Sequence, residues 1–219
     1  MKKLLIYYDN PNEASDMYLK WLKKDLDKEG INYVIVENYD NFCETLKGET
    51  PFDIEPYRVL PMMPVEDERV IDYLAYSNNI IDKTWLDIDN VGGNSKYKDA
   101  TAEGIYNHIV SEFPDRTNTI SVIGRGKVGK PLIDILIDYG YTVCEFNSKS
   151  NLFHKNIICM HSDIIVGLST ETVFSSDDCE RFINDGIVLI DANNTFNTDG
   201  KTRCGKWTRE VLLSRLKED

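Results

Sequence analysis

The stretch VIGRGKVGKP, residues 122–131, contains three glycines spaced as Gly-x-Gly-x-x-Gly. The apolar run Thr119–Ile123 leads into this stretch, and a second apolar run, Thr142–Phe146, follows it. The residues between the two runs have a helical pattern over Pro131–Tyr139, and Gly140 is placed to end that helix. Strand, glycine loop, helix and strand therefore predict a complete β-α-β unit.

Each glycine of the loop has its own task in such a unit. Gly124 permits the tight turn after the strand, Gly126 lets a diphosphate approach the backbone, and Gly129 lets the helix pack closely on the strand. The phosphates of a dinucleotide would meet free backbone N–H groups at the start of the helix. Arg125 and Lys127 add two cations to the loop. We interpret the loop as a nucleotide site; the alternative is a tight turn without a ligand.

The end of the second strand bears on the choice between NAD and NADP. NAD sites place a carboxylate about 20 residues after the first glycine to bind the ribose hydroxyls, and Glu145 lies near that distance from Gly124. Glu145 is inside the apolar run, however, and Ser148 and Lys149 follow the strand. A hydroxyl and a cation suit a 2′-phosphate, which Arg125 also approaches. The sequence favours NADP; NAD and a merely solvated turn are the alternatives.

Composition and charge exclude several classes of function. The chain has 219 residues, of which 42% are hydrophobic and 28% are charged. No apolar run approaches the roughly 20 residues that a membrane span needs. The formal net charge of −12 repels nucleic acids, and no basic patch offsets it. Five cysteines, without a Cys-x-x-Cys spacing, favour a reducing cytoplasm and no metal site.

Short β-rich runs alternate with amphipathic stretches over the first hundred residues, which predicts a three-layer α/β lobe with a parallel sheet. The predicted strands are Lys3–Tyr8, Asn32–Glu37 and Tyr57–Met62, and the predicted helices are Glu13–Glu29, Asn41–Lys47 and Val65–Tyr76. In the first helix, apolar residues recur at three- and four-residue steps and predict a buried stripe. The stripe consists of Ala14, Met17, Tyr18, Trp21, Leu22 and Leu26.

A polar stretch over residues 82–100 interrupts this pattern and is interpreted as the connection between two lobes. A helix over Thr101–Phe113, with Thr101 as its N-cap, then opens a second α/β rhythm. Its later elements are the strands Thr119–Ile123, Thr142–Phe146, Asp163–Leu168 and Ile187–Asp191 and the helices Pro131–Tyr139, Asp177–Asn184 and Thr208–Leu216. The sequence thus predicts an N-terminal lobe over residues 1–100 and a Rossmann-like NAD(P)-binding domain over residues 101–204.

Several motifs resemble the bifunctional methylenetetrahydrofolate dehydrogenase/methenyltetrahydrofolate cyclohydrolase family. TAEGIYNHIVSE (101–112) is similar to the start of its Thr-Pro-x-Gly helix, and TISVIGRGKVGKP (119–131) to its Val-Ile-Gly-Arg-Ser-x-x-Val-Gly-x-Pro loop. VLIDANN (188–194) is similar to its Val-Ile-Asp-Val-Gly motif. A weaker resemblance includes DNPNEASDMYLKWLKK (9–24) and LPMMP (60–64). The matching positions are Thr101, Gly104, Gly124, Arg125, Val128, Gly129, Pro131, Ser148, Asp163 and Asp191.

The resemblance implies two α/β lobes, a C-terminal helix within residues 205–219 that returns to the first lobe, and a homodimer. It also implies an oxidoreductase of one-carbon metabolism, which passes a hydride from the methylene group of a tetrahydrofolate to NADP. Such an enzyme mainly aligns two rings and excludes water. The implied cofactor-binding residues are Gly124, Arg125, Gly126, Lys127, Gly129, Ser148, Lys149 and Ser169.

The family's cyclohydrolase step, by contrast, lacks its proton carrier in this chain. The family motif Tyr-x-x-x-Lys is represented by Tyr18, which is placed to stack on a substrate ring, and by Leu22 at the lysine position. The position of the family's glutamine holds Val59 or Leu60, depending on one gap. Because an aliphatic side chain cannot carry a proton, the sequence predicts that cyclohydrolase activity is lost.

Other departures also fall in the folate half. The aspartate that grips the pterin in the family corresponds to Thr84, with Asp82 or Asp87 as substitutes, and the Pro-Gly-Gly-Val-Gly-Pro loop is absent. Two hypotheses remain. The chain is either a dehydrogenase for a methylene-folate-like substrate, or a non-catalytic dinucleotide-binding pseudoenzyme or regulatory module. The residues expected to shape the substrate pocket are Tyr18, Leu22, Met62, Thr84 and Trp85.

Overall fold

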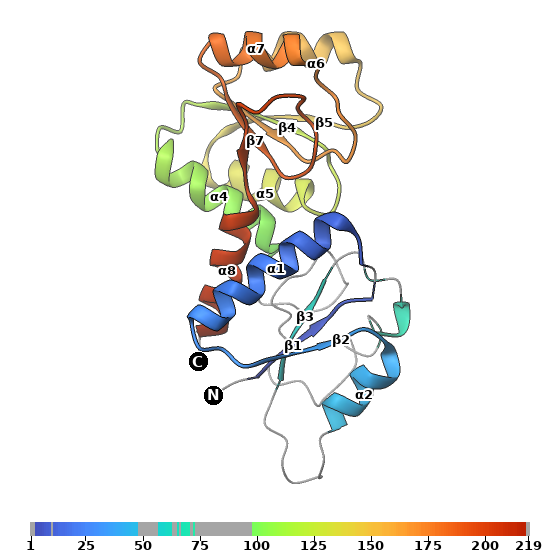
Figure 1. Cartoon of the computed structure of the whole chain (residues 1–219). Coiled ribbons are helices and arrows are strands. Elements are labelled where there is room, and N and C mark those ends of the chain that lie inside the picture. Colours follow the sequence, from blue (N-terminus) through green and yellow to red (C-terminus); the bar gives the residue numbers. More distant parts are fainter. Residues whose placement is uncertain are drawn as a thin grey trace. The chain divides into compact units, whose positions relative to one another are not determined.

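A computed structural model describes residues 3–9, 11–47, 57–62, 65, 67–70, 72 and 98–217 (Figure 1). The chain divides into two compact units. The first unit comprises Met1–Ala100 and Arg209–Asp219, and the second unit comprises Thr101–Thr208. Each unit contains a parallel sheet with helices. The predicted fold class, an α/β lobe followed by a Rossmann-like lobe, is confirmed.

The sheet of the first unit has three parallel strands in the order β2-β1-β3. They are β1 (Lys3–Tyr7), β2 (Tyr33–Val36) and β3 (Tyr57–Pro61), and the helices between them are α1 (Glu13–Lys28) and α2 (Tyr39–Lys47). All five match predicted elements to within two residues at each end. The predicted helix Val65–Tyr76 is described only at isolated positions, and the predicted connection lies outside the described residues up to residue 97.

Side chains of the central strand β1 alternate between two cores. Leu4 and Ile6 pack in a core that α1 and the terminal helix α8 (Gly205–Lys217) cover, whereas Leu5 and Tyr7 pack in a core that α2 covers. Successive residues of a strand point to opposite faces, so one apolar run serves both cores. The first unit therefore has three layers, as the sequence predicts.

The buried face of α1 differs from the predicted stripe. Met17 is 52% exposed and Trp21 is 45% exposed, so these two predicted members are wrong. The predicted members Leu22 and Leu26 are buried, and Leu19, which was not predicted, is buried with them. The spacing of these buried residues follows one narrow line along the helix, because a helix that packs on one sheet buries only part of its circumference.

Ion pairs connect α8 to α1 within the first unit. The Arg209 Nε atom lies 2.7 Å from Asp25 Oδ2, and the Lys217 Nζ atom lies 2.7 Å from Glu29 Oε2. Lys217 lowers the pKa of Glu29 through a hydrogen bond and its charge. These contacts fix how the C-terminal residues of α8 lie along α1.

The sheet of the second unit has five parallel strands in the order β5-β4-β6-β7-β8. The strands are β4 (Thr119–Ile123), β5 (Thr142–Phe146), β6 (Ile164–Gly167), β7 (Val188–Asp191) and β8 (Thr202–Arg203). The helices are α4 (Ala100–Glu112), α5 (Gly129–Tyr139), α6 (Leu152–Cys159) and α7 (Ser176–Asn184). From β4 the chain continues to β5 on one side of it and then crosses to β6 on its other side. The carboxyl ends of β4 and β6 therefore form a topological switch point.

Two cores cover the two faces of this sheet. Val122 and Val166 pack with residues of α4 and α5, whereas Ile123 and Ile165 pack with residues of α6 and α7. Figure 1 shows α6 and α7 on one side of the sheet and α4 and α5 on the other. All residues of β6 are buried, which is typical of a parallel strand between two helical layers.

Helix α6 is an element that the sequence pattern misses. Its apolar residues point outward, with Leu152 52% and Phe153 68% exposed, while Lys155 and Cys159 are buried. Helical periodicity assumes apolar side chains inside, and this helix reverses that assignment. The Asn151 side chain accepts hydrogen bonds from the first turn and begins the helix.

The predicted N-cap of α4 is also wrong. The helix starts at Ala100, which places Thr101 inside its first turn. The Thr208 hydroxyl donates to the Thr101 hydroxyl oxygen at 3.3 Å, and the Cβ position of Gly104 would lie 2.8 Å from the Trp207 carbonyl carbon. The match to the Thr-x-x-Gly pattern thus reflects a close approach between α4 and the start of α8.

Truncation of the α1 stripe tests the core of the first unit. Leu22 is fully buried, so Leu22→Ala is expected to lower the free energy of unfolding by about 2–5 kcal/mol. Lys20→Ala, at an exposed position of the same helix, should change it by less than about 0.5 kcal/mol. Urea unfolding followed by circular dichroism measures both, and equal effects would contradict the assignment of the buried face.

The stability of the second unit is expected to depend on His108. The His108 ring stacks on Trp207 with 3.7 Å between centroids, and burial lowers the pKa of this histidine. The unfolded chain then binds a proton more readily than the folded one, so stability is full above about pH 6.5 and falls as the pH drops toward 5. His108→Gln should weaken this dependence, whereas the exposed His154→Gln should not. Thermal unfolding across this range checks the slope, and a slope unchanged by His108→Gln would refute the assignment.

Candidate nucleotide-binding site

The glycine loop begins with a backbone conformation that favours glycine. Gly124 directly follows β4 and has φ 112°, a region that other residues rarely adopt. Its N–H donates to the Phe146 carbonyl at 2.8 Å, so the turn starts while the backbone is still bonded to β5. A Cβ atom on Gly124 would also lie 3.2 Å from the Leu168 carbonyl carbon. The end of β4, the end of β5 and the loop after β6 therefore meet at this residue.

The other two glycines of the loop have different surroundings. A Cβ atom on Gly129 would lie 1.9 Å from the Gly124 carbonyl oxygen, a distance that no side chain can occupy. A Cβ atom on Gly126 would meet nothing within 4 Å. The fold itself thus requires glycine at 124 and 129. At position 126 the absence of a side chain leaves the backbone accessible from the solvent.

Helix α5 begins at the loop without a side-chain cap. Its N-cap residue, Val128, makes no side-chain hydrogen bond to the first turn. The other end is closed by Gly140, with φ 101°, whose N–H donates to carbonyls of the last turn. An N-terminus without a side-chain cap carries partial positive charge and suits an anion.

The loop after β6 forms the second side of the switch point. The Leu168 N–H donates to the Ile123 carbonyl at 2.8 Å, which keeps this loop beside the end of β4. The Ser169 N–H donates to Thr195 Oγ1 at 3.0 Å, and the Thr195 hydroxyl donates to the Ser169 carbonyl at 3.2 Å. Ser169 is therefore held through its backbone by one buried threonine.

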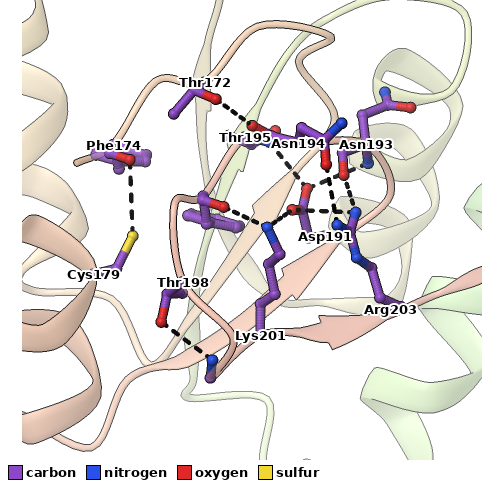
Figure 2. A network of polar contacts seen from close by, with 12 residues as sticks. Thr172, Phe174, Cys179, Asp191, Asn193, Asn194, Thr195, Thr198, Lys201 and Arg203 are labelled. Carbon is purple, nitrogen blue, oxygen red and sulfur yellow. Dashed lines mark hydrogen bonds and ion pairs between the residues drawn. The ribbon is translucent and has the colours of Figure 1, made fainter. Parts of the chain in front are cut away.

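Asp191 anchors the loop that carries Thr195. Its carboxylate is fully buried at the end of β7, and its Oδ1 atom accepts from the N–H groups of Asn193 at 3.3 Å and Thr195 at 3.2 Å. Its Oδ2 atom lies 3.1 Å from Lys201 Nζ and 3.5 Å from an Arg203 nitrogen. Figure 2 shows the carboxylate between these two cations. A buried charge needs such partners, so Asp191 has a structural role.

The structure brings Arg125 and Glu145 together. The Arg125 Nη1 atom lies 3.2 Å from Glu145 Oε1, with both side chains about half exposed. Ser148 and Lys149 follow in an exposed turn, in which the Lys149 N–H donates to Asn147 Oδ1 at 2.9 Å. The predicted cofactor-binding residues Arg125 and Lys149 thus have solvent-exposed side chains. Arg125, however, already forms an ion pair with Glu145.

The predicted substrate residues lie in the first unit and are mostly core residues. Leu22, at the position of the family lysine, is fully buried, and Met62 is 6% exposed. Both belong to the core beneath α1, against which the half-buried Tyr18 packs. Thr84 and Trp85 lie outside the described residues.

A hollow of about 580 Å³ lies at the carboxyl ends of β1 and β2. Burial, followed by the negative charge of Asp9, raises the pKa of the Tyr7 phenol in its wall. The excess of carboxylates disfavours a polyanionic ligand there. The residues that line this hollow are Tyr7, Asp9, Glu37, Asn38, Asp67, Glu68 and Arg69.

Two classes of site lack support in the part of the chain that the structure describes. No group of three or more His, Cys, Asp or Glu residues there is arranged to hold a metal ion. Among the same residues, none of the helices is both long and apolar enough for a membrane crossing.

The fold and the glycine loop define the class of protein: an α/β protein with a Rossmann-like unit whose glycine loop lies at the switch point of a parallel sheet. No profile of a known protein family matches the chain. Two curated relatives align with it, and both are named "Bifunctional protein FolD". The one from Polynucleobacter necessarius is 27% identical over 218 residues, covering 92% of this chain and 72% of the relative. The one from Petrotoga mobilis is 27% identical over 209 residues, covering 91% and 73%.

Solved structures show the same fold. FolD from Trypanosoma brucei, a methylenetetrahydrofolate dehydrogenase-cyclohydrolase complexed with NADP and an inhibitor, superimposes with a TM-score of 0.69 at 18% identity over 97% of this chain and 84% of that one. The NAD-dependent methylenetetrahydrofolate dehydrogenase from Saccharomyces cerevisiae gives 0.65 at 15% identity over 98% and 86%. The predicted resemblance to the bifunctional methylenetetrahydrofolate dehydrogenase/cyclohydrolase family is therefore confirmed: the chain is similar in sequence to two proteins named FolD and shares the fold of solved structures of such enzymes.

Replacement of single loop glycines tests the geometry of the loop. Gly129→Ala forces a methyl group against a backbone oxygen and is expected to lower the free energy of unfolding by about 3 kcal/mol, the upper end of the range for overpacking. Gly126→Ala meets open space and should change it by less than about 0.5 kcal/mol. Denaturant unfolding measures both variants. Equal tolerance of the two substitutions would contradict the close approach at Gly129.

Proposed function

We propose that the protein is an NADP-dependent methylenetetrahydrofolate dehydrogenase-like oxidoreductase that has lost cyclohydrolase activity. The observation that carries this proposal is the glycine loop at the switch point. Gly124 and Gly129 are required by the fold, whereas the open backbone at Gly126 has no evident structural reason and fits the approach of a diphosphate. The relatives named FolD align over more than nine-tenths of the chain, which supports the same reading.

Hydride transfer makes modest demands on the protein. The hydride passes from the methylene carbon of the substrate to the nicotinamide ring, and the bound dinucleotide supplies this redox chemistry. The protein must bind both molecules, align the two rings and exclude water. In this proposal, the backbone of the loop and the N-terminus of α5 hold the diphosphate, and Tyr18 contacts the flat ring of the substrate. None of these tasks requires a proton carrier at position 22.

Loss of the hydrolytic step is supported by burial as well as by residue type. Attack of water on a methenyl bridge requires a positioned proton carrier. Leu22 is fully buried and aliphatic, and the alternative positions for the family's glutamine, Val59 and Leu60, are 1% and 2% exposed. These side chains cannot donate or accept a proton, and they take part in cores on both faces of the first sheet.

The cofactor is proposed to be a nicotinamide dinucleotide, with NADP favoured over NAD. The structural neighbours include one complexed with NADP and one that is NAD-dependent. In this chain Arg125 and Lys127 of the glycine loop and Lys149 after β5 are exposed, together with Ser148. Three cations and a hydroxyl suit a 2′-phosphate.

A second candidate function, a dinucleotide-binding module without catalysis, rests on a specific observation. All described positions that correspond to proton-transfer residues of the family are buried and apolar. A pseudoenzyme could keep the nucleotide site while its substrate pocket fills with core side chains. In either case, we expect the protein to act in the cytoplasm and to form a homodimer, as its resemblance to the family implies.

A coupled assay separates the two candidates. With methylenetetrahydrofolate and NADP, the dehydrogenase should produce NADPH, seen as absorbance at about 340 nm, while methenyltetrahydrofolate should not be hydrolysed above the uncatalysed rate. Gly126→Ala should weaken NADP binding by about tenfold, because a methyl group then occupies the path of the diphosphate. Its unfolding should match that of the unsubstituted protein, which excludes misfolding as the cause.

The outcomes are distinct. NADP-dependent thermal stabilisation without formation of NADPH would support the module and contradict the enzyme. Absence of binding by both NADP and NAD would contradict both candidates. Hydrolysis of the methenyl compound would refute the proposed loss of cyclohydrolase activity.

A further inference from the structure

We propose that Glu145 sets the selectivity of the nucleotide site by competing with the 2′-phosphate of NADP for Arg125, so that the site tolerates NAD. This inference rests on the proposed function, because it concerns the same dinucleotide. It goes beyond that function by naming the residue that limits the preference for NADP.

The geometry begins with the strand register. Glu145 is paired with Val122 across β4 and β5, one residue before Phe146 accepts the hydrogen bond from the Gly124 N–H. The side chain at 145 therefore stands beside the start of the glycine loop. Arg125, the residue after Gly124, reaches back to it, with 3.2 Å between Nη1 and Oε1.

Arg125 differs from the other cations of the site. Lys127 and Lys149 are exposed and have no ion pair in the described part of the chain, whereas Arg125 has one with Glu145. Arg125 also directly follows Gly124, the first residue after β4. An anion that reaches the loop near the end of β5 thus meets one cation whose charge is already partly compensated.

The competition follows from the charges. A phosphate monoester carries about −1.5 to −2 charges at pH 7, so it is repelled by the Glu145 carboxylate and attracted by Arg125. Half-exposed ion pairs contribute little, so the phosphate can displace the carboxylate from Arg125. The carboxylate nevertheless remains close by on β5, because its backbone is fixed in the sheet. NAD has only a hydroxyl at this position, so Glu145 does not oppose its binding.

The test removes the charge of Glu145 and keeps its shape. Glu145→Gln is expected to tighten NADP by about tenfold and to change NAD by less than about twofold, as expected for removal of one charge contact that solvent partly screens. Adenosine 2′,5′-bisphosphate and adenosine 5′-monophosphate, which differ only in the 2′-phosphate, should show the same contrast without any hydride transfer. Isothermal titration measures all four affinities.

Two further variants isolate the cause. Glu180→Gln changes the net charge equally at an exposed position of α7 and should leave the ratio of NADP to NAD affinity unchanged. In an Arg125→Gln background, Glu145→Gln should change this ratio by less than about threefold, because competition for Arg125 is gone and only direct repulsion between the carboxylate and the phosphate remains. Thermal unfolding of each variant verifies that the fold is intact.

Failure of the inference is distinguishable from failure of the proposed function. If the unsubstituted protein binds none of the four ligands, the proposed nucleotide site itself is wrong. If it binds them and Glu145→Gln leaves the ratio unchanged, the inference is overturned while the site stands. Weaker binding of NADP by Glu145→Gln would also overturn it, since Glu145 would then orient Arg125 toward the phosphate.

Discussion

The close approach of two backbone segments at Gly129 and Gly124 is the constraint on which the nucleotide site depends. The start of α5 packs so tightly on the turn after β4 that a Cβ atom at 129 would lie 1.9 Å from the Gly124 oxygen. This contact directs the N-terminus of α5 toward the switch point of the sheet, where Leu168 closes the other side. The position of this helix N-terminus at the switch point, where an anion could meet it, then follows from one packing requirement.

The surrounding framework keeps this contact in place through burial and one compensated charge. Alternating side chains of β4 and β6 serve helical layers on both faces of the sheet, so the strand ends cannot shift without disturbing two cores. Asp191, held by Lys201 and backbone N–H groups, fixes Thr195, which in turn fixes the backbone of Ser169. Figure 2 shows Asp191 with its partners Lys201, Arg203, Asn193 and Thr195. In the first unit, Leu22 occupies the position of the family lysine and belongs to the core.

Most helices and strands could be predicted from the sequence, because the spacing of their apolar residues agrees with the burial of these residues in the fold. β4 and β5 were predicted with their observed bounds, since fully or half-buried parallel strands read as apolar runs between turn residues. Helix α6 escaped prediction because its exposed face is apolar and its buried face includes Lys155. The roles of Thr195 and Lys201 were also invisible, since both lie in a polar stretch and acquire partners only through the fold. The ion pair of Arg125 depends on the register of β4 and β5, which no local pattern specifies.

The central claim is that a dinucleotide diphosphate binds to the backbone of the glycine loop. The most direct measurement is a titration of isotopically labelled protein with NADP, followed through the backbone amide resonances. The account predicts that the largest shifts occur at Gly126, Lys127 and the first residues of α5, with smaller shifts at Ser169. Shifts concentrated in the hollow near Tyr7 and Asp67, or no shifts at saturating NADP, would contradict it.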